Sequence, residues 1–164
     1  MRRSLTCGVI MFLGLTATPM ATHSGSQVPT AEPHQADPRL LTLKSYLKKK
    51  QYPMTIWSED FIEAADRYAL DWRLLPAIAI IESTGGKHYR NNNILGWGSC
   101  TIPFPSIRDG IHHVAHRLAH SEIYRGKDLD KILRTYNPSA LYPGRVRRIM
   151  RTLGPLDPVQ PLVN

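Results

Sequence analysis

Glu82 is the side chain of this sequence best placed to do chemistry. It follows the most apolar run of the chain, residues 74–81, and helical spacing puts it on the same face as Leu75 and Ile78. An apolar setting and the negative end of a helix dipole both favour the protonated form of a carboxyl group. We therefore expect Glu82 to act as a general acid. The alternative is structural, with a carboxylate that turns outward at the helix end and binds the glycine-rich turn after it.

The stretch after Glu82, residues 83–104, is rich in glycine, asparagine and aromatic side chains. Loops of this length inside compact domains are usually functional or mobile. Amides bond the hydroxyl and acetamido groups of a sugar, and a flat indole such as that of Trp97 covers the apolar face of a sugar ring. These residues predict a carbohydrate groove beside Glu82. The alternative for Trp97 is a core residue that anchors the loop.

Four short motifs follow one another along residues 57–153. They are Glu82-Ser83 at the end of an apolar helix, Gly85-Gly86, Asn92-Asn93-Ile94-Leu95-Gly96, and Tyr136-Asn137-Pro138 followed by Tyr142. This ordered set resembles the lysozyme superfamily, and within it the bacterial lytic transglycosylases and the glucosaminidase-type autolysins. The resemblance implies a helical domain with a central apolar helix and a long loop that forms the substrate groove.

The resemblance also implies roles for individual side chains. Glu82 would be the catalytic acid and base, and Tyr136 would lie beside the reacting sugar, where it steadies the developing charge or the acetamido group. The residues implied to bind substrate are Ser83, Asn92, Asn93, Gly96, Trp97, Asn137 and Tyr142. The activity expected is cleavage of β-1,4 bonds between N-acetylated amino sugars in peptidoglycan glycan strands, with no cofactor.

The positions of the carboxylates limit the mechanism. Glycosidases usually carry two carboxyl groups, roughly 5–5.5 Å apart for retention or 6.5–9.5 Å apart for inversion. No Asp or Glu lies between Glu82 and Asp109, and Asp109 is expected to form a capping box with Ser106. The loop after Glu82 therefore supplies no second carboxylate, and the N-acetyl group of the substrate would assist instead. The alternative is that the fold brings Glu59, Asp60 or Asp71 to Glu82 from elsewhere in the sequence.

Two outcomes of a single-glutamate mechanism remain open at this point. Attack by water gives hydrolysis, as in an endo-β-N-acetylglucosaminidase, whereas attack by the sugar's own 6-hydroxyl gives the anhydro product of a lytic transglycosylase. Two alternatives fall outside the enzymes. The same groove could belong to a cell-wall glycan-binding module that cuts nothing, or the domain could be a helical adaptor in the envelope.

Four histidines share one predicted helix, residues 106–122, and comprise His112, His113, His116 and His120. The apolar stripe of that helix lies on its other side, so the imidazoles are expected to face solvent. Pairs four residues apart have the spacing of helical metal ligands, but no nearby carboxylate or cysteine completes a set. We therefore expect no metal site.

Apolar periodicity predicts an all-α domain over residues 39–153 and no strand long enough to build a sheet. A cap is expected at Ser58 for the second helix and at Asp71 for the third. Pro143 is expected to open the last helix. The expected helices cover residues 40–47, 58–69, 73–84, 106–122, 128–136 and 143–153.

The two ends of the chain have a different character from this domain. Residues 1–21 show the basic start, apolar run and small residues of a secretory signal, with cleavage expected at residues 21–24. The apolar run is shorter than the roughly 20 residues of a membrane-spanning helix. Residues 22–38 are expected to form a flexible linker, and residues 154–164 an extended proline-rich tail. We therefore expect an exported monomer, periplasmic or extracellular, without a membrane span after cleavage.

Charge limits the partners. The chain of 164 residues has 21 Lys and Arg against 13 Asp and Glu, a formal net charge of +8, of which the predicted signal carries two positive charges. Such a balance attracts polyanions. Because an exported protein rarely meets nucleic acid, we expect the cell wall to be its anionic partner. Basic residues gather on one face of the last helix and at Lys48-Lys49-Lys50, where they either bind an anionic polymer or only face solvent.

Overall fold

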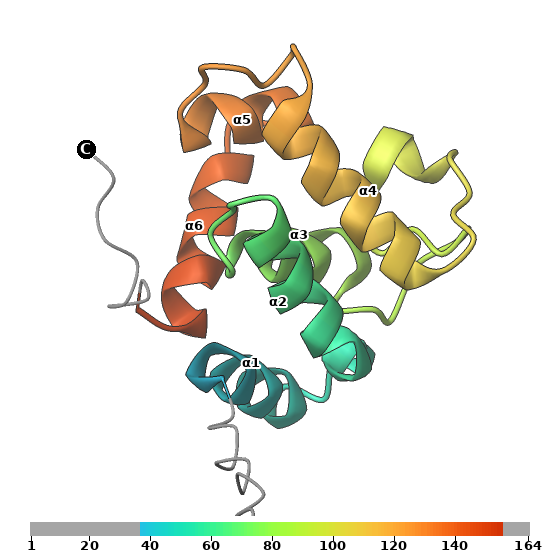
Figure 1. The fold of residues 1–164 in the computed structure, drawn as a ribbon, viewed down its shortest axis with the longest axis vertical. Helices are drawn as coiled ribbons and strands as arrows, with labels where there is room; N and C mark the ends of the chain where they lie inside the picture. The colour runs from blue at the N-terminus through green and yellow to red at the C-terminus, as the bar shows by residue number, and fades with distance from the viewer. Residues whose placement is uncertain (1–36, 156–164) are drawn as a thin grey trace, which may run out of the picture. The chain divides into compact units, whose positions relative to one another are not determined.

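The computed structural model describes residues 37–155, and the regular secondary structure in this part of the chain consists of helices alone, with no strand (Figure 1). The predicted all-α class is therefore confirmed. The predicted signal, most of the predicted linker and residues 156–164 of the predicted tail lie outside the described residues. The elements are α1 (Pro38–Lys49), η1 (Pro53–Trp57), α2 (Ser58–Arg67), α3 (Leu74–Ser83), η2 (Trp97–Cys100), α4 (Ile107–His120), α5 (Leu129–Tyr136) and α6 (Tyr142–Leu153), where η denotes a 3₁₀ helix.

Side-chain caps determine where three of the helices begin. The Asp37 carboxylate accepts a hydrogen bond of 2.8 Å from the backbone N–H of Arg39, so α1 begins at Pro38, inside the segment predicted to be a linker. The Ser106 hydroxyl accepts from the backbone N–H of Asp109 at 3.1 Å, so Ser106 caps α4 as predicted. The Asp109 carboxylate accepts from the Ser106 hydroxyl rather than from the Ser106 backbone N–H that a capping box would use. Asp128 caps α5 in a similar way.

Two other predicted caps are wrong. Ser58 is the first residue of α2 rather than its cap, because η1 precedes it directly and the Ser58 hydroxyl donates to the backbone oxygen of Thr55. Asp71 does not adjoin α3, which begins at Leu74. Its carboxylate instead binds the backbone and guanidinium of Arg73. The last helix likewise begins one residue before Pro143.

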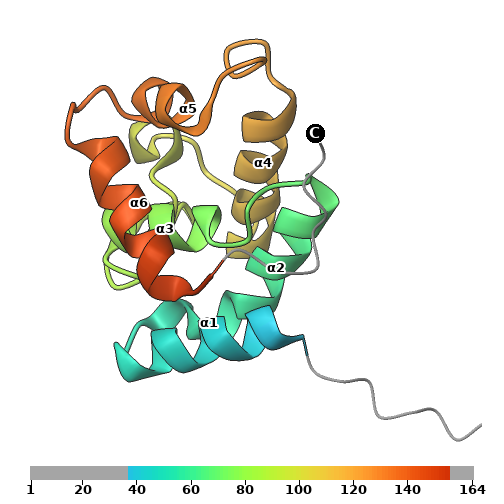
Figure 2. The same cartoon turned by 90° about the vertical axis from the view of Figure 1, so that its left-hand side faces the viewer.

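The core lies where α3 packs against α2 and α6. Residues 74–79 of α3 are all buried. Phe61 of α2 and Val146 of α6 are fully buried in the same cluster. Figure 2 shows α6 alongside α3, and both views place α1 beneath them. Burial of these apolar side chains is the main contribution to the stability of the domain.

A tight turn ends α3 directly after Glu82. Thr84 has a left-handed backbone conformation with φ of 53°, and a Cβ atom at Gly85 would meet the Tyr52 ring at 2.4 Å. The Ser83 hydroxyl donates to the backbone oxygen of Ala79 at 2.8 Å and accepts from the N–H of Gly86 at 3.0 Å. These bonds set the direction in which the following loop, residues 84–106, leaves the helix.

The longest helix in residues 37–155 is α4, with 14 residues. None of the helices described there combines the length and apolar character that a membrane crossing needs.

Candidate functional site

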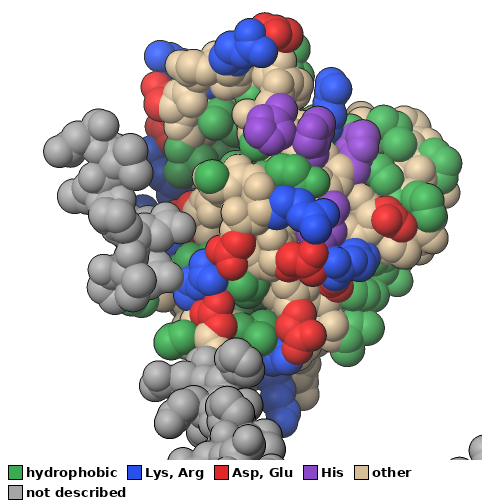
Figure 3. All heavy atoms as spheres, in the orientation of Figure 1, with side chains coloured by type: hydrophobic (Ala, Val, Ile, Leu, Met, Phe, Trp, Pro, Cys, Tyr) green, Lys and Arg blue, Asp and Glu red, His purple; other side chains and the backbone are tan. Residues whose placement is uncertain are grey.

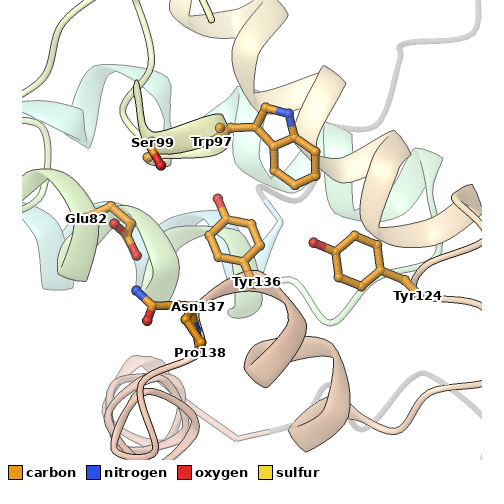
Figure 4. A pocket seen from close by; sticks show the side chains of 9 residues that line it. Glu82, Trp97, Ser99, Tyr124, Tyr136, Asn137 and Pro138 are labelled. Carbon is orange, nitrogen blue, oxygen red and sulfur yellow. The ribbon is translucent and has the colours of Figure 1, made fainter. Parts of the chain in front are cut away.

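Glu82 lines a pocket of about 440 Å³ that is built from three separate segments of the chain. The last turn of α3 contributes Glu82, the loop between α3 and α4 forms one wall, and the segments around α5 form the other (Figure 4). Glu82 is the sole acidic residue among those that line it. The others are Gly96, Trp97, Gly98, Ser99, Tyr124, Tyr136, Asn137 and Pro138. The volume falls in the range of small-ligand sites, roughly 300–1,000 Å³.

The carboxyl group of Glu82 lies directly against the loop backbone at Gly96. A Cβ atom at Gly96 would stand 2.6 Å from Oε2 of Glu82 and 3.0 Å from its Cδ. Gly96 also has φ of +71°, a conformation that side chains rarely adopt. Glycine is therefore required at this position for two reasons: a Cβ atom would collide with the Glu82 carboxyl group, and the backbone has a positive φ. Glu82 faces the pocket in this arrangement rather than the Gly85-Gly86 turn.

Tyr136 connects the two walls of the pocket. Its hydroxyl donates to the backbone oxygen of Leu95, and its ring contacts that of Trp97 with centroids 5.7 Å apart. On its other side it stacks on Tyr142, with centroids 6.2 Å apart and planes 10° apart. Burial, and then the negative charge of Glu82, raise the pKa of the Tyr136 hydroxyl well above its usual value.

Tyr142 lies behind the pocket wall, where 2% of it is exposed. Its hydroxyl makes no hydrogen bond of standard geometry within the described residues. Burial raises the pKa of this hydroxyl, and the nearby carboxylate of Glu82 raises it further. Both tyrosines therefore stay protonated at physiological pH.

Asn137 and Trp97 complete the polar and aromatic lining. The Asn137 side-chain oxygen accepts from the backbone N–H of Ser139 at 3.1 Å, which orients the amide. The amide nitrogen points toward Glu82 in Figure 4. Trp97 is partly buried and has its ring edge against His113, with centroids 6.1 Å apart. The pocket thus combines one carboxylate with amide, hydroxyl and aromatic groups.

Four of the residues predicted to bind substrate do not line this pocket, namely Ser83, Asn92, Asn93 and Tyr142. Asn93 is 2% exposed, and its amide donates to the backbone oxygen of Trp97 at 2.8 Å and accepts from its N–H at 2.9 Å. Asn92 donates to the backbone oxygen of Phe104 at 2.9 Å. The two asparagines therefore hold the loop in shape, as Ser83 does for the turn before it.

Four lining residues were not predicted from the sequence. Pro138 belongs to the Tyr136-Asn137-Pro138 motif but was given no role in the site, and Gly98 and Ser99 are the two residues that follow Trp97 in the sequence. Tyr124 is different, because it lies in the irregular segment after α4 and no spacing connects it with Glu82.

The histidine face of α4 differs from the prediction at His112. This side chain is 13% exposed, and its Nε2 lies 3.9 Å from a Glu63 oxygen of the neighbouring α2. Burial, and then the charge of Arg108, lower the pKa of His112. His113, His116 and His120 are exposed as predicted, and Figure 3 shows histidines beside acidic and basic side chains on this face.

Helix packing brings carboxylates to the histidines, which the sequence did not predict. Asp60, Glu63 and His112 offer atoms within 4.8 Å of one another, a spacing within reach of a metal ion. Both carboxylates already pair with the Arg108 guanidinium, which is 2.6 Å from Glu63. The cluster in this form is an ionic link between α2 and α4.

Comparison with family models, curated proteins and solved structures finds no match for the chain. The functional interpretation depends on the residues and geometry described above.

Proposed function

We propose that this protein cleaves β-1,4 bonds between N-acetylated amino sugars in peptidoglycan glycan strands, with Glu82 as the catalytic acid and base. The observation that carries the proposal is a single carboxylate, held against Gly96, in a pocket whose other groups are hydroxyls, amides and aromatic rings. Such a lining suits a sugar with an acetamido group. The domain would be lysozyme-like, with α3 as its central helix, and would act outside the cytoplasm.

The first step would transfer the Glu82 proton to the glycosidic oxygen as the bond from that oxygen to the anomeric carbon breaks. No second carboxylate lines the pocket, so the acetamido oxygen of the substrate would attack the anomeric carbon. The Tyr136 hydroxyl donates a hydrogen bond to the backbone oxygen of Leu95, so the lone pairs of the Tyr136 oxygen would be free to accept a hydrogen bond from the acetamido N–H. Tyr142 would donate to the Glu82 carboxylate once it is ionised.

The second step would use Glu82 as a base. The carboxylate takes a proton from the attacking hydroxyl group as that oxygen bonds to the anomeric carbon and the acetamido group is released. Water yields a reducing end, and the 6-hydroxyl of the same sugar yields an anhydro end. Both outcomes follow from the same pocket, and the products distinguish them.

The test is to incubate purified peptidoglycan with the wild type and with Glu82→Gln, and to read the soluble products by mass spectrometry. Glutamine keeps the shape of the side chain but cannot donate the proton, and general acid catalysis is worth about 10²–10⁴-fold. We therefore expect product formation to fall at least about 100-fold. Glu122→Gln is the matched control, because Glu122 is exposed and pairs only with Arg125 within the described residues.

Anhydro ends in the product would identify a transglycosylase, and reducing ends a hydrolase. Products that do not depend on Glu82 would contradict the proposed mechanism. Glycan that binds to the wild type and is not cut would favour the alternative of a glycan-binding module.

A further inference from the structure

Within the described residues, four arginines on α5 and α6 have no carboxylate partner, and three of them gather on one side of the molecule: Arg134, Arg145 and Arg148. α6 contains four arginines and no acidic residue, and among them Arg147 pairs with Asp130 of α5 at 2.6 Å. No ion pair within residues 37–155 involves Arg134, Arg145 or Arg148. These guanidinium groups give this side of the molecule an uncompensated positive charge.

The same arginines line two adjoining hollows. One, of about 360 Å³, lies between α3 and α6 and is lined by Arg145 and Arg148 together with Ile80, Ile81 and Ile149. The other, of about 410 Å³, is lined by the same two arginines with Arg134, Arg147 and the apolar Leu141 and Pro143. Because Arg145 and Arg148 belong to both, we treat the two hollows as one surface and call it the arginine cleft.

The arginine cleft adjoins the Glu82 pocket along two segments of the chain. Ile81 of α3 lines the cleft, and the next residue, Glu82, lines the pocket. Ala140 lines the cleft two residues after Pro138, which lines the pocket. The cleft and the pocket therefore adjoin each other at the end of α3 and in the segment between α5 and α6.

The chemistry of the cleft fits carboxylates on a short aliphatic peptide. Guanidinium groups bind carboxylates with two parallel hydrogen bonds, and they do so best where water is partly excluded. The isoleucine and leucine walls suit small aliphatic side chains, and Leu141 is 75% exposed. A neutral sugar has no negative charge to pair with three guanidinium groups. A flat layer of lipid headgroups would not contact the recessed apolar walls.

Peptidoglycan strands carry short peptides with free carboxylates, so the proposed substrate supplies a ligand of this class. We propose that the arginine cleft binds the acidic peptides that branch from the glycan strand. The identity of the strand rests on the proposed function, whereas the affinity of the cleft for an acidic peptide does not.

The experiment compares peptide-bearing glycan strands with the same strands stripped of peptide by an amidase. Arg145→Gln/Arg148→Gln removes the two arginines that both hollows share. Arg117→Gln/Arg151→Gln is the matched control, because both arginines are exposed, line neither hollow and make no ion pair within the described residues. We expect the first variant to need about tenfold more peptide-bearing strand for half-maximal rate, a loss typical of one or two charged hydrogen bonds. We expect no change on stripped strands or in the control.

A binding measurement tests the cleft without any cleavage. The purified acidic tetrapeptide of peptidoglycan is titrated into the full chain and into Glu82→Gln, with binding followed by NMR. We expect both to bind the peptide and the cleft variant to bind it about tenfold more weakly. If the wild type binds the peptide through these arginines but does not cleave glycan strands, the proposed function is wrong and the proposed role of the arginine cleft is supported.

Three results would overturn the proposal. The first is no binding of the tetrapeptide by the wild type. The second is an equal loss in the control variant or on stripped strands, since either would show an effect of net charge or of folding. The third is arginine-dependent binding to vesicles of anionic phospholipid with none to the peptide, which would assign the surface to a membrane.

Discussion

Gly96 sets how closely the loop backbone approaches the proposed catalytic acid. Its missing side chain leaves the space in which the Glu82 carboxylate lies, and its positive φ turns the chain toward Trp97. Glycine at this position is therefore part of the site, although it contributes no functional group.

Gly96→Ala tests this role. The new methyl group would stand 2.6 Å from Oε2 of Glu82, so the carboxylate or the loop must move. Displacement of a catalytic group by about 1 Å costs on the order of 10²-fold, so we expect at least a tenfold fall in the rate of glycan cleavage. We also expect the free energy of unfolding to fall by about 1–2 kcal/mol through backbone strain.

Gly126→Ala is the control for that strain. Gly126 has a similar φ of +67°, yet a Cβ atom there would have nothing within 4 Å. Equal losses of cleavage in the two variants would mean that strain, rather than contact with Glu82, explains the effect.

The sequence motifs were informative about residues whose chemistry has few alternative uses. Glu82, Gly96, Trp97, Tyr136 and Asn137 were all predicted, and the structure brings them to one pocket. Asparagines were harder to assign, because an amide binds a sugar or a backbone carbonyl equally well. Which of the two it binds depends on the path of a loop that has no periodic pattern.

At the scale of elements, the loop between α3 and α4 holds its shape through buried side-chain bonds. Asn93 donates to the backbone oxygen of Trp97 and accepts from its N–H, which closes the short segment that contains Gly96. The site therefore depends on an irregular segment whose conformation is stabilised by the buried Asn93 amide.

Asn93→Ala should show that dependence. Removing the amide leaves backbone groups of the loop without partners, and each such buried group costs about 1–3 kcal/mol. We expect a fall of that size in the free energy of unfolding, measured by urea denaturation, together with loss of glycan cleavage. Thr101→Ala removes an exposed bond to Gly98 in the same loop and should change stability by less than about 0.5 kcal/mol. Unchanged stability and activity in Asn93→Ala would contradict this account of the loop.

The sequence predicted which segments form α-helices, but it did not predict which helices pack against one another. The starts of α4 and α5 carry capping residues three positions before the residue they bind, and such local signals can be read directly from the sequence. The short helices η1 and η2 have no periodicity to detect. The approach of Asp60 and Glu63 to Arg108 and His112 arises from the packing of α2 on α4, so nothing in the spacing of either helix indicates it.

At the scale of the whole molecule, the burial of His112 makes the free energy of unfolding depend on pH. Burial and the charge of Arg108 lower its pKa from the ordinary histidine value of about 6.5, and the charge of Glu63 opposes this only in part. The unfolded chain therefore binds a proton at a higher pH than the folded chain. Stability from this group is complete above about pH 6.5 and is lost as the pH falls through that value toward the folded pKa.

We therefore expect the free energy of unfolding to fall between pH 7.5 and pH 5, as measured by urea denaturation at several pH values. His112→Gln should reduce that fall. It should not remove it, because His113, although largely exposed, is partly desolvated and its pKa is lowered in the same direction. His120→Gln, at an exposed position on the same helix, is the control. A pH dependence identical in His112→Gln and the wild type would show that this histidine contributes nothing to it.

The hydrogen bond from Tyr136 to Leu95 joins two walls of the pocket that lie 41 positions apart in the chain. The width between the walls is therefore set in the free protein, before any glycan arrives. A preorganised groove needs no closing movement, so little binding free energy is lost to ordering the protein. The fixed distance between the walls also cannot increase to admit a larger sugar ring. Selection among sugars would therefore depend on their fit to a rigid groove and not on a conformational change of the protein.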